Sequence, residues 1–263
     1  MDIYPQSIGN MIKEDLIKHM CDTMEQTMGD TMLAEFCIKT FDKISLENPQ
    51  AVMKSQAITM SLNMIDFFDV ATQAKILTLL LNCCNRAGSE EEFNQYFMNM
   101  IPQLCPMLSV HSDGDQARAE KVSTIFYRMA ESFTFFYSPS KHFEQLAALW
   151  NKFAETGAIN CIMDCLKTYA HDLEANELMQ KASADEGHMD FEMITTQNIG
   201  SQKKTYTDAT LSNFFKLLTI GSKFSLLLID TIINSGAIES LEKLLPHDDH
   251  QPGYINDLAS LLN

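Results

Sequence analysis

Two segments of the chain share one hydrophobic pattern that starts with Gly-Ala-Ile. They are TGAINCIMDCL at residues 156–166 and SGAIESLEKLL at residues 235–245. Apolar residues follow at helical spacing in both, so each segment predicts a helix with one buried face. Gly157 and Gly236 allow a sharp turn into that helix, because glycine has no Cβ atom. Two segments with the same beginning indicate a repeated unit and therefore a solenoid.

Two further segments keep part of this pattern. They are KSQAITMSLNMIDF at residues 54–67 and MIPQLCPML at residues 100–108, in which Ile58 and Ile101 take the place of Ile159. The spacing from Ile58 to Ile101 matches helical repeats of the armadillo and HEAT kind, about 40 to 47 residues. The two later spacings are longer, which predicts insertions between the repeats.

The rest of the chain predicts helices as well. Amphipathic or apolar runs at helical spacing occupy residues 11–28, 31–44, 71–84, 93–108, 116–130, 206–218, 224–233 and 254–262. The predicted fold is therefore all-α, a helical solenoid of about four repeats. We expect residues 1–30 to form an N-terminal helix that completes or caps the first repeat, and residues 31–263 to form the repeats.

Two stretches predict the insertions. Residues 134–152 are aromatic and include the single tryptophan, Trp150, which favours an ordered insertion. Residues 168–205 are polar, acidic and without sustained periodicity after Met179, which is typical of a partly disordered surface loop. Without that loop the last repeat spacing returns to the armadillo range.

Composition and charge narrow the function classes. The chain has 263 residues, 46% of them hydrophobic, with 35 acidic against 19 basic side chains and a net charge of −16. This balance argues against a nucleic-acid partner, which needs clustered Lys and Arg. It suits a basic or mixed-charge protein partner, although a solvated acidic surface has the same composition. No apolar run reaches the length of a membrane span, so no membrane partner is expected.

Seven cysteines, an odd number, lie mostly within apolar helical runs. This is typical of reduced, buried thiols in a cytoplasmic or nuclear protein. Cys161 and Cys165 are four residues apart on one predicted helix face, yet a structural zinc site needs four ligands and no matching histidine pair follows. We therefore expect no metal site, no cofactor and no catalytic residue.

Three runs of residues resemble a known family. They are VSTIFYRMAESF from Val122, the following LAALWNKFAETGAINCIMDCL, and TYTDATLSNFFKLLTIGSKFSLLLIDTIINSGAIESLEKLL. Together they resemble the armadillo region of large HECT-type E3 ubiquitin ligases, the ubiquitin-fusion-degradation and thyroid-receptor-interacting ligases. FDKISLENPQAVMKSQAITMSLNMIDFF and LLLNCCNRAGSEEEFNQYFMNMIPQLCPML are similar to the preceding repeats, so the resemblance covers about residues 30 to 246.

The resemblance implies an armadillo-like right-handed superhelix of three-helix repeats whose concave face binds protein. It implies ubiquitin, or ubiquitinated and ubiquitin-fusion substrates, as partners in proteasomal degradation. The catalytic HECT domain of the family is absent from these residues, so this chain is expected to be a non-catalytic scaffold. It would be a fragment, a truncated product or a separate adaptor of the cytoplasm or nucleus.

Two other functions are compared with this one. An armadillo adaptor outside the ubiquitin system, such as a nuclear-import receptor, would also be acidic and would bind Lys-rich peptides. That class uses repeated tryptophans, each followed one turn later by asparagine, whereas Ala154 stands four residues after Trp150. An all-helical enzyme would need an acid, a base and a nucleophile in one constellation, and no motif here indicates one.

The third helices of armadillo repeats line the concave groove, so exposed polar positions there are the candidate binding residues. These are Asn63, Asp66, Gln103, Asn160, Asp164, Glu239 and Lys243. The same positions would also serve as the solvated face of each helix. As a hypothesis, Asp66, Asp164 and Glu239 form an acidic stripe that faces a basic surface of ubiquitin or of a substrate.

Overall fold

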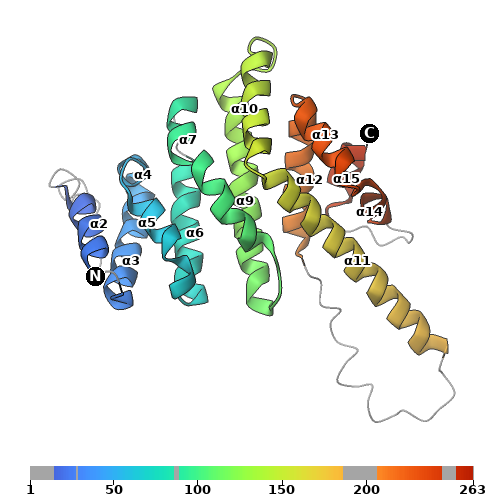
Figure 1. Ribbon diagram of the computed structural model, residues 1–263, viewed down its shortest axis with the longest axis horizontal. Helices are drawn as coiled ribbons and strands as arrows, with labels where there is room; N and C mark the ends of the chain where they lie inside the picture. Colours follow the sequence, from blue (N-terminus) through green and yellow to red (C-terminus); the bar gives the residue numbers. More distant parts are fainter. Residues whose placement is uncertain (1–14, 28, 86–88, 186–205, 245–252, 263) are drawn as a thin grey trace.

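The described part of the chain is built from helices packed side by side. The computed structural model describes residues 15–27, 29–85, 89–185, 206–244 and 253–262, and no strand occurs in these ranges. Figure 1 shows the helices following one another along the longest axis, from α2 at one end to α12–α15 near the other. The predicted all-α class is confirmed for these residues.

The helices have the following bounds. The first half contains α2 (Leu16–Gln26), α3 (Thr31–Glu47), α4 (Pro49–Met53), α5 (Ala57–Asn63), the 3₁₀ helix η1 (Ile65–Phe67), α6 (Val70–Cys84), α7 (Glu90–Tyr96), η2 (Met98–Met100), α8 (Ile101–Leu104) and η3 (Cys105–Leu108). The second half contains α9 (Asp113–Phe136), α10 (Phe143–Glu155), α11 (Ala158–Asp185), α12 (Asp208–Ser222), α13 (Leu226–Asn234), α14 (Ile238–Lys243) and α15 (Ile255–Leu262).

Short polar side chains define where the helices begin. Asp69 accepts a 2.8 Å hydrogen bond from the Thr72 backbone N–H at the start of α6, and Ser225 accepts one of 3.0 Å from that of Leu228 in α13. These bonds satisfy N–H groups that have no partner within their own helix. Asn48 ends α3 and caps α4, whose first turn contains Pro49, as the proline in the sequence predicts.

Helices pack on partners three α helices further along the chain. One continuous row is α3 on α6, α6 on α9, α9 on α12, and α12 on α15. The same offset recurs outside this row, where α2 packs on α5, α10 on α13 and α11 on α14. In these seven pairs a helix therefore packs on the helix three places further along the chain.

A hydrogen bond between side chains crosses each of three interfaces in the α3–α6–α9–α12–α15 row. Asn82 of α6 donates to Ser45 of α3 at 3.0 Å. Asn213 of α12 donates to Ser123 of α9 at 3.1 Å. Ser212 of α12 donates to Asp257 of α15 at 2.6 Å. Such bonds need a particular alignment of the two helices, so they stabilise the register of helices that otherwise meet through apolar side chains.

An aromatic cluster holds the middle of the molecule together. The ring of Phe133 in α9 lies 5.1 Å from Phe93 of α7 and 5.2 Å from Trp150 of α10, both edge to face. Phe153 completes the cluster, and all four side chains are fully buried. Edge-to-face contacts add to the free energy gained from burying the apolar rings. The cluster therefore joins three helices that local sequence pattern alone does not connect.

The stretch at residues 134–152, expected to be an aromatic insertion, lies mostly within two helices. Its first residues complete α9, and after a short link from Tyr137 to His142 the remainder forms most of α10. The apolar side chains of α10 are the reason, because Leu146, Trp150 and Phe153 are buried against neighbouring helices. Trp150 thus belongs to a core helix, whereas Phe135 and Phe143 of this stretch are exposed.

The predicted loop at residues 168–205 is wrong in its first part. Helix α11 continues to Asp185, well beyond Thr168. Tyr169 and Ala170 are buried and Leu173 packs against the core, so the apolar face of α11 extends beyond Thr168, where the loop was expected to begin. The remainder, residues 186–205, lies outside the described residues. So do the first residues of the predicted N-terminal helix, of which α2 is the described part.

No helix in the described ranges combines the length and the hydropathy needed to span a bilayer.

Candidate functional site

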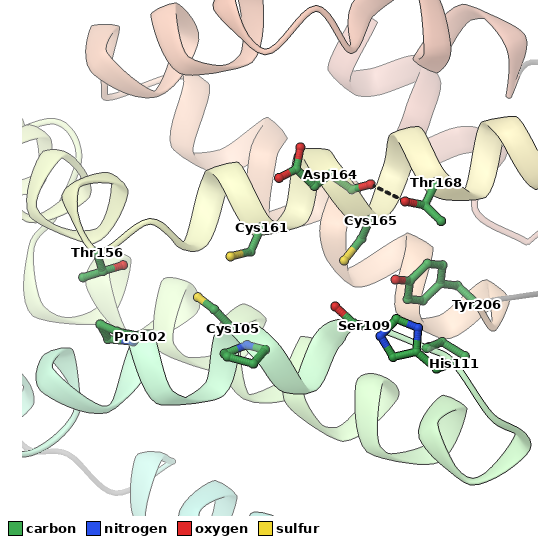
Figure 2. A pocket seen from close by; sticks show the side chains of 12 residues that line it. Pro102, Cys105, Ser109, His111, Thr156, Cys161, Asp164, Cys165, Thr168 and Tyr206 are labelled. Carbon is green, nitrogen blue, oxygen red and sulfur yellow. Dashed lines mark hydrogen bonds between the residues drawn. The ribbon is translucent and has the colours of Figure 1, made fainter.

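A groove of about 470 Å³ opens between η3 and α11. Figure 2 shows its walls, with Cys105 and Ser109 on one side and Cys161, Asp164, Cys165 and Thr168 of α11 on the other. The η3 helix comes from the predicted segment 100–108 and α11 from segment 156–166. The groove therefore lies between two segments that the sequence places in the same position of successive repeats.

Two prolines shape the first wall. Pro102 stands in the first turn of α8 and Pro106 in the first turn of η3. Proline has no backbone N–H to donate, so it fits the first turn of a helix, where that donor has no intrahelical partner. The two short helices follow one another directly, and Ser109 then adopts extended backbone that leads the chain out of the wall.

A glycine turn positions the second wall. Gly157 has φ +85° and Gly236, before α14, has φ +68°. A residue with a Cβ atom is strained at such angles, so the predicted role of both glycines is confirmed. Behind each turn Ala158 and Ala237 are fully buried, and α11 packs directly on α14. The second Gly-Ala-Ile segment thus lies beside α11, where Lys167 donates to the Ser235 carbonyl oxygen at 3.4 Å.

Two cysteines meet across the groove. The thiols of Cys105 and Cys161 point toward one another in Figure 2. The pKa of Cys105 is raised mainly by a hydrogen bond with the Cys161 sulfur and, to a smaller extent, by burial. The same hydrogen bond, given by the Cys105 thiol, lowers the pKa of Cys161, although burial and Asp164 oppose the effect. Cys161 is half-buried whereas Cys105 is buried, so the thiolate forms first on Cys161.

A third thiol closes the inner end of the groove. Burial raises the pKa of Cys165 to about 11, although a hydrogen bond with the Tyr206 side chain opposes this shift. Burial likewise raises the pKa of Tyr206, whose ring packs on Tyr169 and Phe214. Cys165 therefore remains a neutral thiol near pH 7.

All seven predicted binding residues are exposed, and the structure places them as follows. Asn63 ends α5, Asp66 lies in η1, Gln103 in α8, Asn160 and Asp164 on α11, and Glu239 and Lys243 on α14. Asp164 is among the side chains that line the groove. It also forms a 2.6 Å ion pair with Lys167 on its own helix.

Lys243 and Glu174 form the ion pair that connects α14 to α11, at 2.6 Å. In the sequence, η1 with Asp66 precedes the two segments that form the groove, and α14 with Glu239 follows them. Nothing in the structure tests whether a partner uses these residues, and the acidic stripe stays a prediction.

Sequence reasoning missed the pairing of Cys105 with Cys161. It singled out Cys161 and Cys165, because only these two are close enough along the chain to share a helix face. The signal for Cys105 was its place in segment 100–108, which carries the repeat pattern of segment 156–166. Helices in the same position of successive repeats are neighbours, so cysteines in both segments can meet.

The described residues contain no group of three or more His, Cys, Asp and Glu side chains arranged to hold a metal ion.

The position of the tryptophan argues against the import-receptor alternative. Trp150 is fully buried in the aromatic cluster, so its indole is not available to stack on a lysine side chain of a peptide.

Comparison with known proteins finds partial similarity to plant ubiquitin ligases. The chain is 29% identical over 130 residues to the E3 ubiquitin-protein ligase UPL4 of Arabidopsis thaliana, covering 49% of this chain and 8% of that protein. It is 32% identical over 101 residues to UPL3 of the same plant, covering 38% of this chain and 5% of that protein. The matched stretch is thus a small part of each relative. It links the chain to E3 ubiquitin-protein ligases over less than half of its own length.

No protein-family model matches the chain. Among solved structures, a crystal structure of an engineered protein aligns over 94% of this chain and 96% of its own, with a TM-score of 0.41 and 14% identity.

Proposed function

We propose that this chain is a non-catalytic, protein-binding scaffold of a HECT-type E3 ubiquitin ligase, which recognises ubiquitin or a ubiquitinated substrate for degradation. The partial similarity to UPL4 and UPL3 is the observation that carries the proposal. Both proteins are E3 ubiquitin-protein ligases by name, and the matched stretch is too small a part of either to imply a whole ligase here.

The packing pattern supports an armadillo-like solenoid as the form of this scaffold. Helices contact their counterparts three α helices along the chain in the row from α3 to α15, and again in the pairs α10 with α13 and α11 with α14. A chain of three-helix units, each in contact with its neighbours only, produces this pattern. In such a solenoid the third helices line one face. Six of the seven candidate binding residues lie on α5, α8, α11 and α14, and Asp66 lies in η1 directly after α5.

Charge supports a protein partner with a basic surface. The net charge of the chain is −16, and Asp66 of η1, Asp164 of α11 and Glu239 of α14 are exposed carboxylates. Opposite charges at the rim of an interface mainly raise the association rate and select the partner. Binding through this stripe should therefore weaken as the salt concentration rises.

A titration tests the proposal. Isotope-labelled ubiquitin, as a monomer and as Lys-linked chains, is titrated with the full chain while backbone amide shifts are recorded. Saturable shifts on one basic face of ubiquitin are expected. The triple variant Asp66→Lys, Asp164→Lys, Glu239→Lys should weaken them at least tenfold.

A matched control separates the stripe from net charge. Reversal of Glu47, Glu144 and Asp230 changes the net charge equally, but these residues are exposed on α3, α10 and α13. The control should change the affinity by no more than about twofold, and that change would come from the altered net charge alone. Equal weakening by both triple variants would refute the stripe, and no shifts with monomer or chains at high micromolar concentration would refute ubiquitin recognition.

A further inference from the structure

The cysteines of the chain differ in their access to solvent. Six of the seven are buried, and Cys161 alone is partly exposed. Burial raises the pKa of Cys37, Cys83 and Cys84, which lie far from the groove in α3 and α6. The thiolate is the nucleophilic form of cysteine, so these buried thiols are inert near neutral pH. Cys161 is the thiol that a reagent in solution reaches.

The surroundings of Cys161 favour both its ionisation and a second reaction step. Its sulfur opens into the 470 Å³ groove, which gives a small oxidant room to approach. The Cys105 thiol faces it from the opposite wall (Figure 2), and both cysteines line the same groove. A reactive thiol with a second thiol in reach is the arrangement that converts oxidation into a disulfide.

The other groups facing Cys161 do not block this chemistry. On α11, Asp164 opposes ionisation, but its carboxylate is 71% exposed and paired with Lys167 at 2.6 Å. Cys165 is buried, with its thiol directed to the Leu108 carbonyl oxygen at 3.9 Å. His111 lines the groove from the loop after η3, and Tyr206 closes the inner end. Cys105 is therefore the thiol placed to react with an oxidised Cys161.

We propose that Cys161 and Cys105 form a peroxide-reactive dithiol site whose oxidation joins η3 covalently to α11. In the first step the Cys161 thiolate attacks one oxygen of hydrogen peroxide. The O–O bond breaks, hydroxide leaves and takes up a proton, and Cys161 becomes a sulfenic acid. In the second step the Cys105 sulfur attacks the Cys161 sulfur, the S–O bond breaks, and water leaves with the Cys105 proton. Two thiols and one peroxide thus give one disulfide and two waters.

The disulfide would change the groove that it crosses. Cys105 and Cys161 belong to walls built from segments 100–108 and 156–166, so the bond is a bridge between two units of the molecule. It would fix the distance between η3 and α11 within the groove. The site does not depend on the proposed ubiquitin function, and its test uses no ubiquitin.

The test is peptide mapping of the oxidised protein. The full chain is reduced, freed of reductant, treated with one equivalent of hydrogen peroxide, and digested without reductant for mass spectrometry. The expected product is a cross-linked peptide pair containing Cys105 and Cys161, lighter by two hydrogen atoms than the two reduced peptides, within a monomeric chain. This measurement on the unmodified sequence does not depend on whether any variant folds.

Two variants separate the two steps. In Cys105→Ser the sulfenic acid on Cys161 should persist and be trapped by dimedone, whereas Cys161→Ser should lose peroxide consumption by this site. Cys37→Ser is the matched control, and its Cys105–Cys161 cross-link should form as in the unaltered chain. A first-formed disulfide that joins Cys161 to Cys165, a bond between two chains, or oxidation of other thiols before Cys161 would overturn the proposal.

Discussion

Gly221 of α12 lies against the indole ring of Trp150 in α10. A Cβ atom at position 221 would stand 2.7 Å from Cζ3 and 2.8 Å from Cε3 of that ring, and 2.5 Å from Cδ1 of Leu228. Real side chains do not approach so closely, so the absence of a side chain at Gly221 lets α12 reach the aromatic cluster.

Gly221→Ala should therefore destabilise the protein. Overpacking of a filled core costs about 1–3 kcal/mol, and the gain in helix propensity recovers only part of it. The free energy of unfolding in urea measures the effect. Gly114→Ala in α9 is the matched control. A Cβ atom at position 114 would meet only the Val70 side chain, at an ordinary contact distance of 3.8 Å. The control should be neutral or slightly stabilising, and equal stability of both variants would contradict the tight contact.

The two turn glycines should respond differently from Gly221. Gly157 and Gly236 have positive φ, yet no atom lies within 4 Å of a Cβ built on either. Replacement by Ala should cost about 1–2 kcal/mol through backbone strain alone. Replacement by Asn should cost less, because Asn tolerates the left-handed region. Denaturant melts of the four single variants check this, and equal losses for Ala and Asn would point to a packing effect instead.

Phe133 should be among the costliest side chains to remove. Its ring contacts Phe93, Trp150 and Phe153 in a fully buried cluster. Phe133→Ala should lose about 3–5 kcal/mol of stability through the lost burial and the cavity left behind. Phe135 is the matched control in the same helix, because it is 79% exposed and its truncation should change stability by less than about 0.5 kcal/mol. Thermal or urea unfolding distinguishes the two.

Asp115 should make stability depend on pH in the acid range. Its carboxylate accepts backbone hydrogen bonds from His111 at 3.0 Å and Ser112 at 2.8 Å, which lower its pKa in the folded state. A lowered folded pKa stabilises the protein fully above the unfolded value of about 3.9 and less as pH falls through the folded pKa.

Asp115→Asn should therefore lose about 0.5–1 kcal/mol at pH 7, where partial solvent contact screens the charge. The difference from the unaltered chain should shrink as the pH is lowered from about 4 toward the folded pKa. Urea melts across this range measure it. A difference that stays constant down to the lowest pH would mean that the carboxylate charge plays no part.

Cys161 should be alkylated faster than an ordinary thiol at neutral pH. The hydrogen bond from Cys105 lowers the pKa of Cys161 to about 7, although burial and Asp164 act in the opposite direction. The other titratable groups nearby are Cys165, His111, Tyr206 and Lys167. The rate of reaction with iodoacetamide at Cys161, read by mass spectrometry, should rise through a midpoint near this value. In Cys105→Ala, which removes the donor, the midpoint should move up toward or above the usual thiol range, about 8.5; an unmoved midpoint would remove Cys105 as the cause.

The helices and their turns could be predicted from local sequence. Apolar residues at helical spacing determine which face of a helix is buried, and this holds for the fully buried Val122, Ile125, Phe126 and Met129 of α9. Gly157 and Gly236 could be predicted as turn residues because a positive φ is a local backbone requirement that glycine meets best.

The limits of these predictions were set by contacts between distant segments. Residues 168–205 were expected to form a loop, yet α11 continues to Asp185, and Tyr169 and Ala170 near its middle are buried by neighbouring segments. Tertiary burial can extend a helix that its own sequence supports only weakly. Likewise, residues 134–152 were expected to be an insertion, and their place in α9 and α10 follows from the buried cluster of Phe133, Trp150 and Phe153.

By itself, the sequence determined the all-helical class, the glycine turns, the acidic charge and the exposed polar positions of the third helices. Each of these depends on backbone preference or on the periodicity of a single segment. Only the tertiary structure decided that Cys105 meets Cys161, that Gly221 accommodates Trp150, and that a groove opens between η3 and α11. Those relationships join residues far apart in the chain, and no periodicity within one helix specifies which side chain of another helix it will face.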